Sequence, residues 1–407
     1  MTLGWRTALF AAMPAAAGLP LYIHLPQFAA TELGLSLTTV GAILIGLRIF
    51  DLLQDPLLGW MVDRAPARRG QFAALSAFGL AIGFAMLFSV VPPIRADLWM
   101  TLALVILFTA YSLATILIYS QSVAIAEAGG TGGHFSIAGY REAGLIAGVV
   151  LAAIAPTVLG ALGVEPYSGL GILIALVAVI AWATTRPLWA AAPVALPRVR
   201  FAALRDAGAL YLLALAFANA LPVALTSTLF VFFVGDRLGL PDQAGLFLIL
   251  FFAAAGLSAP VWSALARRAD PRHVLIAGMV LAIAGFVGAG LLAPGAGLGF
   301  AIICVVTGAA QGADMVVLSA LFAARLSTAG LPTGQTFGFW AFVSKAALAL
   351  AAIIVLPLLE ARGYRPGGPN PQAAMDALNF SYAVLPCFLK LAAVAMVARL
   401  PSREVAA

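Results

Sequence analysis

The sequence contains few charged residues. Only 9% of the 407 residues are Asp, Glu, Lys or Arg, whereas 63% are hydrophobic, and the mean hydropathy is +1.06. Soluble domains carry about 25% charged residues, so the composition excludes an ordinary soluble protein and indicates one that crosses a membrane many times. A helical span needs about 20 apolar residues, which leaves room for roughly twelve spans joined by short loops.

Several classes of function lack the residues that they require. No G-x-x-x-x-G-K-[ST] phosphate loop exists, so ATP is not expected to drive this chain directly. The three histidines are scattered, and no Ser, Cys and His set has the spacing of a nucleophile and its base. The two cysteines, Cys304 and Cys387, lie far apart in apolar segments and are interpreted as packing residues. We therefore expect neither an enzyme nor a bound cofactor. The basic residues are spread among loops, which argues against nucleic-acid binding.

The apolar segments predict an all-α membrane protein of twelve transmembrane helices in two six-helix bundles. The expected spans are about 5–30, 36–62, 71–92, 98–126, 136–162, 168–186, 207–234, 243–266, 274–293, 297–325, 334–358 and 377–400. Basic loops follow the second and the eighth span, at matching places in the two halves, as an internal repeat predicts. The expected domains are residues 1–187, a cytoplasmic linker at 188–205, and residues 206–407.

The arginines indicate the orientation in the membrane. With twelve spans, most of them fall on the side that also holds both termini, and only Arg95, Arg237, Arg362 and Arg365 fall on the other. Basic loops stay in the cytoplasm, so both termini are expected there, in a bacterial inner (plasma) membrane.

One polar stripe stands out inside the second span. Arg48, Asp51, Asp55 and Gly59 are three or four residues apart and therefore share a helix face. Each ionised side chain at mid-bilayer costs at least ~2.5 kcal/mol, so such groups are usually functional. The alternative is an Arg48–Asp51 pair that only neutralises itself and fastens helices together. That pair still leaves Asp55 in need of a cation, which favours a functional site.

Two further spans carry polar side chains. Tyr111, Thr115 and Tyr119 are four residues apart, with Ser112 beside them, and either join helices by hydrogen bonds or line a cavity. Lys345 lies in the middle of its segment, and is interpreted as a partner of the acidic pair rather than a lysine snorkelling to an interface. Buried acidic residues with basic partners are typical of ion-coupled transporters.

Two motifs are similar to those of a known family. The run Arg48-x-x-Asp51-x-x-Gln54-Asp55-Pro56-x-x-Gly59-x-x-x-Asp63 resembles the helix II signature of the glycoside–pentoside–hexuronide:cation symporters, the melibiose permease-like branch of the major facilitator superfamily. The stretches Glu32–Ser36 and Gly338–Lys345 also resemble that family. The resemblance extends over the whole chain, but the matching residues are sparse outside two motifs. These motifs, in helix II and helix XI, are its specific parts.

The resemblance implies a cation site. Carried over position by position, the site consists of Asp51, Asp55, Gln54 and Ser112, with Lys345 as the charge beside it. Arg48 is the second expected charge partner. Carboxylate, amide and hydroxyl oxygens suit Na+, and the carboxylates alone suit H+. Lys345 is expected to occupy the carboxylates when the cation is absent.

The expected substrate side departs from the family pattern. A sugar-binding aspartate of helix IV falls on Thr115, a nearby tryptophan falls on Tyr119, and the helix I carboxylate is missing. The helix V arginine corresponds to Arg141. The full set of expected substrate residues is Arg141, Thr115, Tyr119, Tyr111, Trp340 and Asp314. Because both carboxylates are lost, a different polar solute or an amphiphile such as a lysolipid is an open alternative to a sugar.

These observations predict a secondary active transporter, in which Na+ or H+ drives symport of a small solute by alternating access. We expect it to act as a monomer in the lipid bilayer. The rivals are a uniporter or lipid flippase whose acidic pair is partly structural, a membrane-embedded enzyme, and an assembly factor that transports nothing. The enzyme is disfavoured because no catalytic constellation was found.

Overall fold

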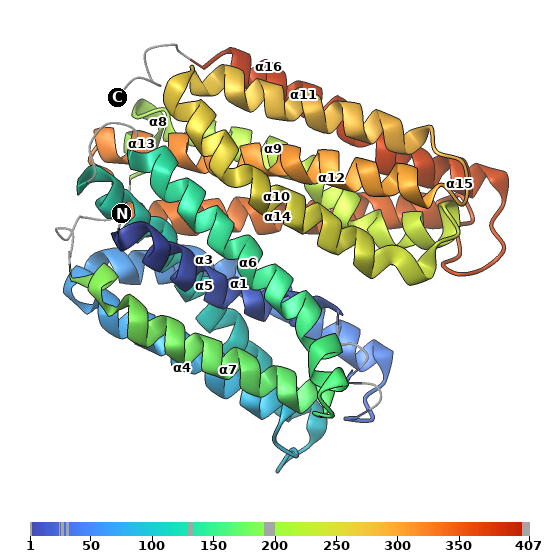
Figure 1. The fold of residues 1–407 in the computed structure, drawn as a ribbon, viewed down its shortest axis with the longest axis horizontal. Coiled ribbons are helices and arrows are strands. Elements are labelled where there is room, and N and C mark those ends of the chain that lie inside the picture. The colour runs from blue at the N-terminus through green and yellow to red at the C-terminus, as the bar shows by residue number, and fades with distance from the viewer. Residues whose placement is uncertain are drawn as a thin grey trace. The chain divides into compact units, whose positions relative to one another are not determined.

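The computed structural model describes residues 2–23, 25, 28–29, 32–128, 133–190 and 200–400. Across these residues the chain is almost entirely helical and contains no strand (Figure 1). Ten described helical spans are long and apolar enough to cross a membrane. In addition, α1 (Thr2–Ile23) and α3 (Leu37–Arg64) occupy the places of the first two predicted spans. The predicted all-α membrane fold is confirmed.

The chain divides into two compact units, of which the first is Met1–Arg200 together with Ala329–Phe342. Besides α1 and α3, it holds η1 (Pro66–Arg68), α4 (Arg69–Phe88), α5 (Ala96–Ala128), α6 (Gly133–Ala161), α7 (Pro166–Thr185) and η2 (Arg186–Trp189). Within this unit α1 packs along α6, and α4 packs against both α5 and α7. The pairing of α4 with α7 is visible in Figure 1.

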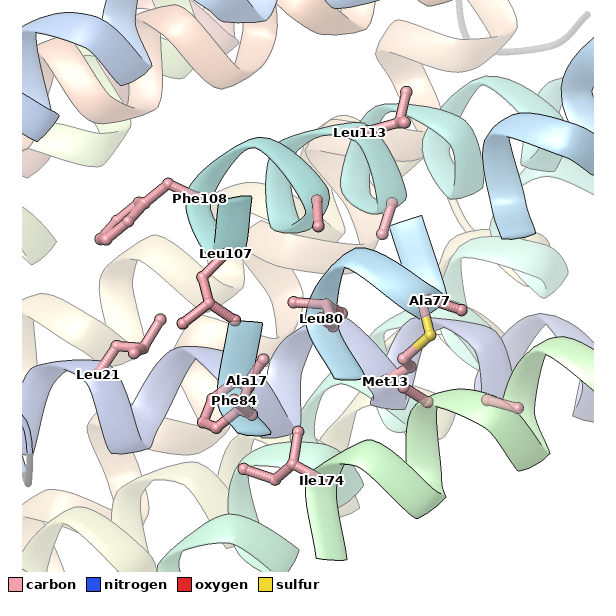
Figure 2. Close-up of a cluster of buried hydrophobic side chains, with 14 of the residues drawn as sticks. Met13, Ala17, Leu21, Ala77, Leu80, Phe84, Leu107, Phe108, Leu113 and Ile174 are labelled. Carbon is pink, nitrogen blue, oxygen red and sulfur yellow. The ribbon is translucent and has the colours of Figure 1, made fainter. Parts of the chain in front are cut away.

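Apolar side chains from four helices fill the centre of the first unit (Figure 2). Met13 of α1, Leu80 and Phe84 of α4, Leu107 of α5 and Ile174 of α7 are all buried there. In membranes, helices associate largely through close packing, so this cluster fixes the positions of the helices that carry the polar residues described below.

Small residues bring α1 and α6 into direct backbone contact. A Cβ atom at Gly144 would collide with the carbonyl oxygen of Ala8, and one at Gly148 with that of Ala12. The two glycines are four residues apart, the spacing by which small residues let membrane helices approach closely. Arg141 lies about one turn before Gly144, so this contact also fixes the part of α6 that carries Arg141.

The second unit is Phe201–Thr328 together with Val343–Ala407. Its elements are α8 (Phe201–Asp206), α9 (Ala209–Phe232), η3 (Phe233–Arg237), η4 (Pro241–Gln243), α10 (Ala244–Arg268), α11 (Pro271–Gly290), α12 (Gly297–Ala313), η5 (Asp314–Leu318), α13 (Ser319–Thr328), α15 (Gln372–Asn379), η6 (Phe380–Val384) and α16 (Leu385–Ala398). The helix α14 (Thr333–Ala361) starts in the first unit and continues in the second.

The predicted domain limits remain predictions. Residues 191–199 of the expected linker lie outside the described residues. The stretch Ala329–Phe342, which the prediction assigned to the C-terminal bundle, groups with the first unit. Its contacts with α3 explain this grouping and are described below.

Three of the membrane-spanning segments of the second unit contain a π-helical stretch: η3 after α9, η5 after α12, and η6 before α16. A π-helical stretch holds an extra residue in the turn, and it is found most often at functional sites. The sequence analysis predicted uninterrupted helices here, because hydropathy reports the length of a span and not its internal hydrogen bonding.

The loop before α11 is fixed by an ionic cap. Asp270 accepts a hydrogen bond from the backbone N–H of Arg272 at 2.9 Å. The side-chain hydrogen bonds from Arg272, helped by this backbone bond, hold the pKa of Asp270 below its ordinary value. Arg272 also donates to the carbonyl oxygen of Leu400 at 2.8 Å. The basic loop is thereby joined to the end of α16.

Candidate functional site

Asp51 lies in a small network of oxygen and amide groups between α3 and α5. The Gln54 amide donates to Asp51 Oδ1 at 2.8 Å, and the Ser112 hydroxyl donates to the same oxygen at 3.0 Å. The Thr109 hydroxyl donates to the side-chain oxygen Oε1 of Gln54 at 2.9 Å. Asp51, Gln54 and Ser112 are all buried. The structure therefore brings together three of the four residues expected in a cation site, and adds Thr109.

Asp55 is completely buried one turn further along α3. At this point α3 packs tightly on the first turns of α14, since a Cβ atom at Gly338 would lie 2.6 Å from the carbonyl oxygen of Asp55. With Asp51, the site holds two carboxylates, a side-chain amide and two hydroxyls. Such oxygens suit a hard cation. No group of three or more His, Cys, Asp and Glu side chains suited to a metal ion occurs in the described part of the chain.

The polar face of α3 continues to Asp63, one turn beyond Gly59. The Asp63 carboxylate accepts the backbone N–H of Gly334 at 2.8 Å and that of Gln335 at 2.6 Å. It thereby satisfies two donors at the start of α14, where a helix favours negative charge. Arg69 lies 3.8 Å away. The sequence analysis placed Asp63 in a basic loop, although its four-residue spacing from Gly59 indicated the shared face.

The two predicted charge partners lie at different places. Arg48 is half-buried on α3, in the first unit with Asp51 and Asp55. Lys345 is half-buried on the part of α14 that belongs to the second unit. The role of Lys345 beside the acidic pair therefore remains a prediction.

Arg141 is held by its neighbours inside the first unit. Its Nε and Nη2 atoms donate to Glu142 Oε1 at 3.0 and 2.8 Å, and its guanidinium lies 3.7 Å from the ring centre of Tyr119. The Tyr119 hydroxyl donates to the same oxygen of Glu142 at 3.1 Å. Arg141 and Glu142 are both buried, so the positive charge is compensated within the protein. The sequence analysis assigned Arg141 to the substrate and gave Glu142 no role.

Aromatic rings extend this cluster towards α14. The ring of Tyr119 lies 5.2 Å from that of Phe337, which lies 6.4 Å from that of Trp340. Three expected substrate residues, Arg141, Tyr119 and Trp340, are thus linked within the first unit. The Thr115 hydroxyl donates to the carbonyl oxygen of Tyr111 at 2.9 Å, so it is engaged within its own helix.

Asp314, the last expected substrate residue, lies in the second unit and forms a buried ion pair with Lys390. Lys390 also donates to the side-chain oxygen of Asn219 at 2.7 Å. Lys390 and Asn219 were not assigned to any site from the sequence. The available signal was that Asp314 is the single acidic residue between Asp270 and Glu360.

Helices of bilayer length with carboxylates buried inside them define a polytopic membrane protein, and such carboxylates are typical of proteins that handle ions or polar solutes. The family comparison identifies it further. The chain belongs to the family described as MFS/sugar transport protein, whose model matches residues 7–404. It is therefore a multi-pass membrane protein of the major facilitator superfamily.

One curated relative is an uncharacterised symporter of Synechocystis sp., which is 28% identical over 200 residues. The match covers 45% of this chain and only 36% of the relative. Two crystal structures of a bacterial homologue of the iron transporter ferroportin are similar in fold, both in the outward-facing state and one soaked with iron. Each has a TM-score of 0.70 and covers 98% of this chain and 99% of its own, at 13% and 14% identity. At such identity the likeness concerns the fold alone.

Proposed function

We propose that this protein is a cation-coupled symporter of the melibiose permease-like branch, in which Na+ or H+ drives the uptake of a small solute by alternating access. The observation that carries the proposal is the network around Asp51, in which Gln54, Ser112 and Thr109 hold oxygen atoms next to two buried carboxylates. The printed name of the Synechocystis relative, a symporter, supports the same class. We also propose a monomer in a bacterial inner membrane, with both termini in the cytoplasm.

The chemistry of the network suits a monovalent cation. Two carboxylates in one buried region repel each other, and both stay ionised only if a cation lies close to them. Na+ would bind the carboxylate, amide and hydroxyl oxygens, whereas H+ would bind to one carboxylate. Either ion lowers the free-energy cost of the buried negative charge. The loaded protein would then change more easily between its outward-facing and inward-facing states.

The substrate region favours a solute without a strong negative charge. The guanidinium of Arg141 is already compensated by Glu142 and covered by the Tyr119 ring. The neighbouring groups are the aromatic rings of Phe337 and Trp340. This composition supports a second candidate, a lysolipid or amphiphile transporter of the same fold, because rings and hydroxyls bind an apolar body better than they bind a compact sugar.

The test begins with the solute. Thermal unfolding of the purified protein is measured against sugars, organic acids and lysolipids, each with and without Na+, since a ligand that binds the folded state raises the unfolding temperature. The solute that stabilises the protein is then loaded into a proteoliposome assay with an imposed Na+ or pH gradient. We expect accumulation against the solute's own gradient. Transport that ignores both ion gradients would instead identify a uniporter or flippase.

A further inference from the structure

The end of the first unit at which α7 stops and α4 starts contains several N–H donors that lack an acceptor. Arg186, the first residue of η2, is exposed and forms no ion pair with any described residue. In the same region Trp189 Nε1 and Arg69 Nε are buried, and neither donates a hydrogen bond to a described residue. Trp189 is 9% exposed and Arg69 only 2%. Buried donors are almost always paired in folded proteins, so this group indicates that a ligand supplies the acceptor.

These donors are neighbours in the fold. The segment η2 continues directly from α7, and a Cβ atom at Gly70 would lie 3.5 Å from the Cβ atom of Trp189, so η2 lies against the first turn of α4. Gln121 of α5 joins the two segments, because it accepts from Arg69 Nη1 at 2.8 Å and donates to the carbonyl oxygen of Leu188 at 2.6 Å. The Arg69 guanidinium is therefore held in place beside η2.

A further donor comes from α1. The Nε atom of Arg6 is also buried and has no hydrogen-bond partner among the described residues. One turn further along α1, Phe10 packs edge-on against Trp189, with 4.8 Å between the ring centres. Three elements, α1, α4 and η2, thus bring buried N–H groups to one end of the unit.

The charge in this region is positive. The elements η1, α4, α7 and η2 contain three arginines, Arg68, Arg69 and Arg186, but no acidic residue. Asp63 lies 3.8 Å from Arg69, and its oxygens already accept the two backbone N–H groups at the start of α14. Arg68 and Arg186 are exposed. A surface with this excess of positive charge attracts an anion.

Apolar side chains continue from Arg186 along α4 and α7, which lie side by side (Figure 1). The Arg186 guanidinium lies 4.5 Å from the ring centre of Trp182, whose ring lies 5.1 Å from that of Phe78. Along the same two helices the large exposed side chains are mostly aliphatic: Leu75, Ile82, Ile172, Leu176, Val179 and Ile180. Basic residues, then a tryptophan, then aliphatic groups is the order in which a membrane protein contacts lipid headgroups, the interface and the acyl chains.

We propose that this end of the first unit binds the phosphate group of an anionic phospholipid. The phosphate oxygens accept hydrogen bonds from Arg186, whose planar guanidinium offers several donors to one phosphate. They also supply the acceptor that the buried donors of Trp189 and Arg69 lack, directly or through a bridging water. The acyl chains lie along the exposed side chains of α4 and α7. A lipid fits this place better than a soluble anion does, because the apolar side chains begin at Trp182, directly under Arg186.

The test measures lipid binding by the full chain. Delipidated protein in detergent is titrated with phosphatidylglycerol or phosphatidylcholine, and the bound lipid is counted by native mass spectrometry. We expect Arg186→Gln to bind phosphatidylglycerol about fivefold more weakly, which is the contribution of one arginine near anionic lipid. Its binding of phosphatidylcholine should be unchanged. Phosphatidylglycerol should also raise the unfolding temperature of the unmodified protein more than phosphatidylcholine does, and this difference should shrink in the variant.

Arg95→Gln is the matched control, because Arg95 is an exposed arginine of the same unit that is already paired with Asp97. This variant should bind phosphatidylglycerol as the unmodified protein does. Equal binding of the two lipids by the unmodified protein, or unchanged phosphatidylglycerol binding by Arg186→Gln, would overturn the proposal. So would inorganic phosphate that alone produces the whole stabilisation, because the ligand would then be a soluble anion. None of these measurements depends on transport, so failure here is distinct from failure of the proposed symport.

Discussion

A carboxylate buried in a membrane protein keeps its charge only where other groups replace the water that it has lost. Around Asp51 these groups include the neutral donors Gln54 and Ser112. Around Glu142 the main group is a cation, Arg141. The first environment includes neutral hydrogen-bond donors, whereas the second is an ion pair. The two carboxylates should therefore respond differently to substitution.

For the first environment, Asp51→Asn or Asp55→Asn removes a negative charge but keeps the size of the side chain. Gradient-driven accumulation of the solute in proteoliposomes should be abolished in both variants, because the cation has lost a ligand. Exchange at equal cation concentrations should be less affected. Asp97→Asn, which changes an exposed pair with Arg95, is the control and should leave accumulation unchanged. Full accumulation by both variants would show that the α3 carboxylates are structural.

For the second environment, Arg141→Ala leaves Glu142 buried without its cation. Breaking a buried pair in this way costs about 3–5 kcal/mol, whereas replacing both partners by apolar residues is often neutral. We expect a large loss of stability for Arg141→Ala and a smaller loss for Arg141→Leu/Glu142→Leu, measured by denaturant unfolding in detergent. If both variants lose equal stability, the pair is not what holds this region together.

For individual residues, the sequence predicted contacts within one helix turn better than contacts between helices. Asp51 and Gln54 are three residues apart, and the family motif added Ser112 to them. The partnerships of Asp63 with Gly334 and of Lys390 with Asn219 span most of the chain. One sequence contains no information on which distant helices meet, so these partners were not predicted.

The helix α14 belongs to both units, since it runs from one into the other at Phe342 and Val343. Its first turns lie along the face of α3 that carries Asp55, Gly59 and Asp63. The glycines permit this approach, because a Cβ atom at Gly334 would lie 2.6 Å from the carbonyl oxygen of Gly59. Asp63 then completes the contact by accepting two backbone N–H groups.

Removal of this cap should weaken the first unit. Asp63→Ala leaves two N–H groups of α14 without their acceptor and leaves the buried Arg69 without its nearest carboxylate. Loss of a capping side chain costs about 1–2 kcal/mol, so the unfolding temperature should fall. Asp206→Ala, in an exposed pair with Arg205, is the control and should have little effect. Equal unfolding temperatures for the two variants would show that the Asp63 contact contributes nothing to stability.

The elements themselves were largely predictable. A predicted span at 334–358 corresponds to Thr333–Ala361, and one at 274–293 to Pro271–Gly290. Hydropathy identifies such segments because lipid requires a continuous apolar helix. The interruption at Asp314–Leu318 was not predicted, since its residues are as apolar as those of a regular helix.

At the scale of the whole molecule, each unit contains its own buried carboxylate centre. Asp51 and Asp55 lie on α3 of the first unit, and Asp314 lies between α12 and α13 of the second. Repeated halves are the rule in this class of transporter, but the chemistry of the two centres differs. The first has several neutral oxygen donors, and the second has a lysine. Under the proposed function the first binds the coupling cation.

The composition of the proposed substrate region leads to a prediction for the solute. Sugars are usually bound by charged side chains that accept several hydroxyl hydrogen bonds. In this chain a threonine, Thr115, falls where the symporter family that the sequence resembles has such an aspartate. The positive charge of Arg141 is compensated by Glu142, and Tyr119 is hydrogen-bonded to the same carboxylate. We therefore expect calorimetry to show no tight binding of melibiose or lactose to the purified protein, with or without Na+. Thr115→Asp, which restores a carboxylate, should lower stability because Arg141 already has a partner. Tight galactoside binding by the unmodified protein would contradict this and place the chain among the sugar transporters of its family.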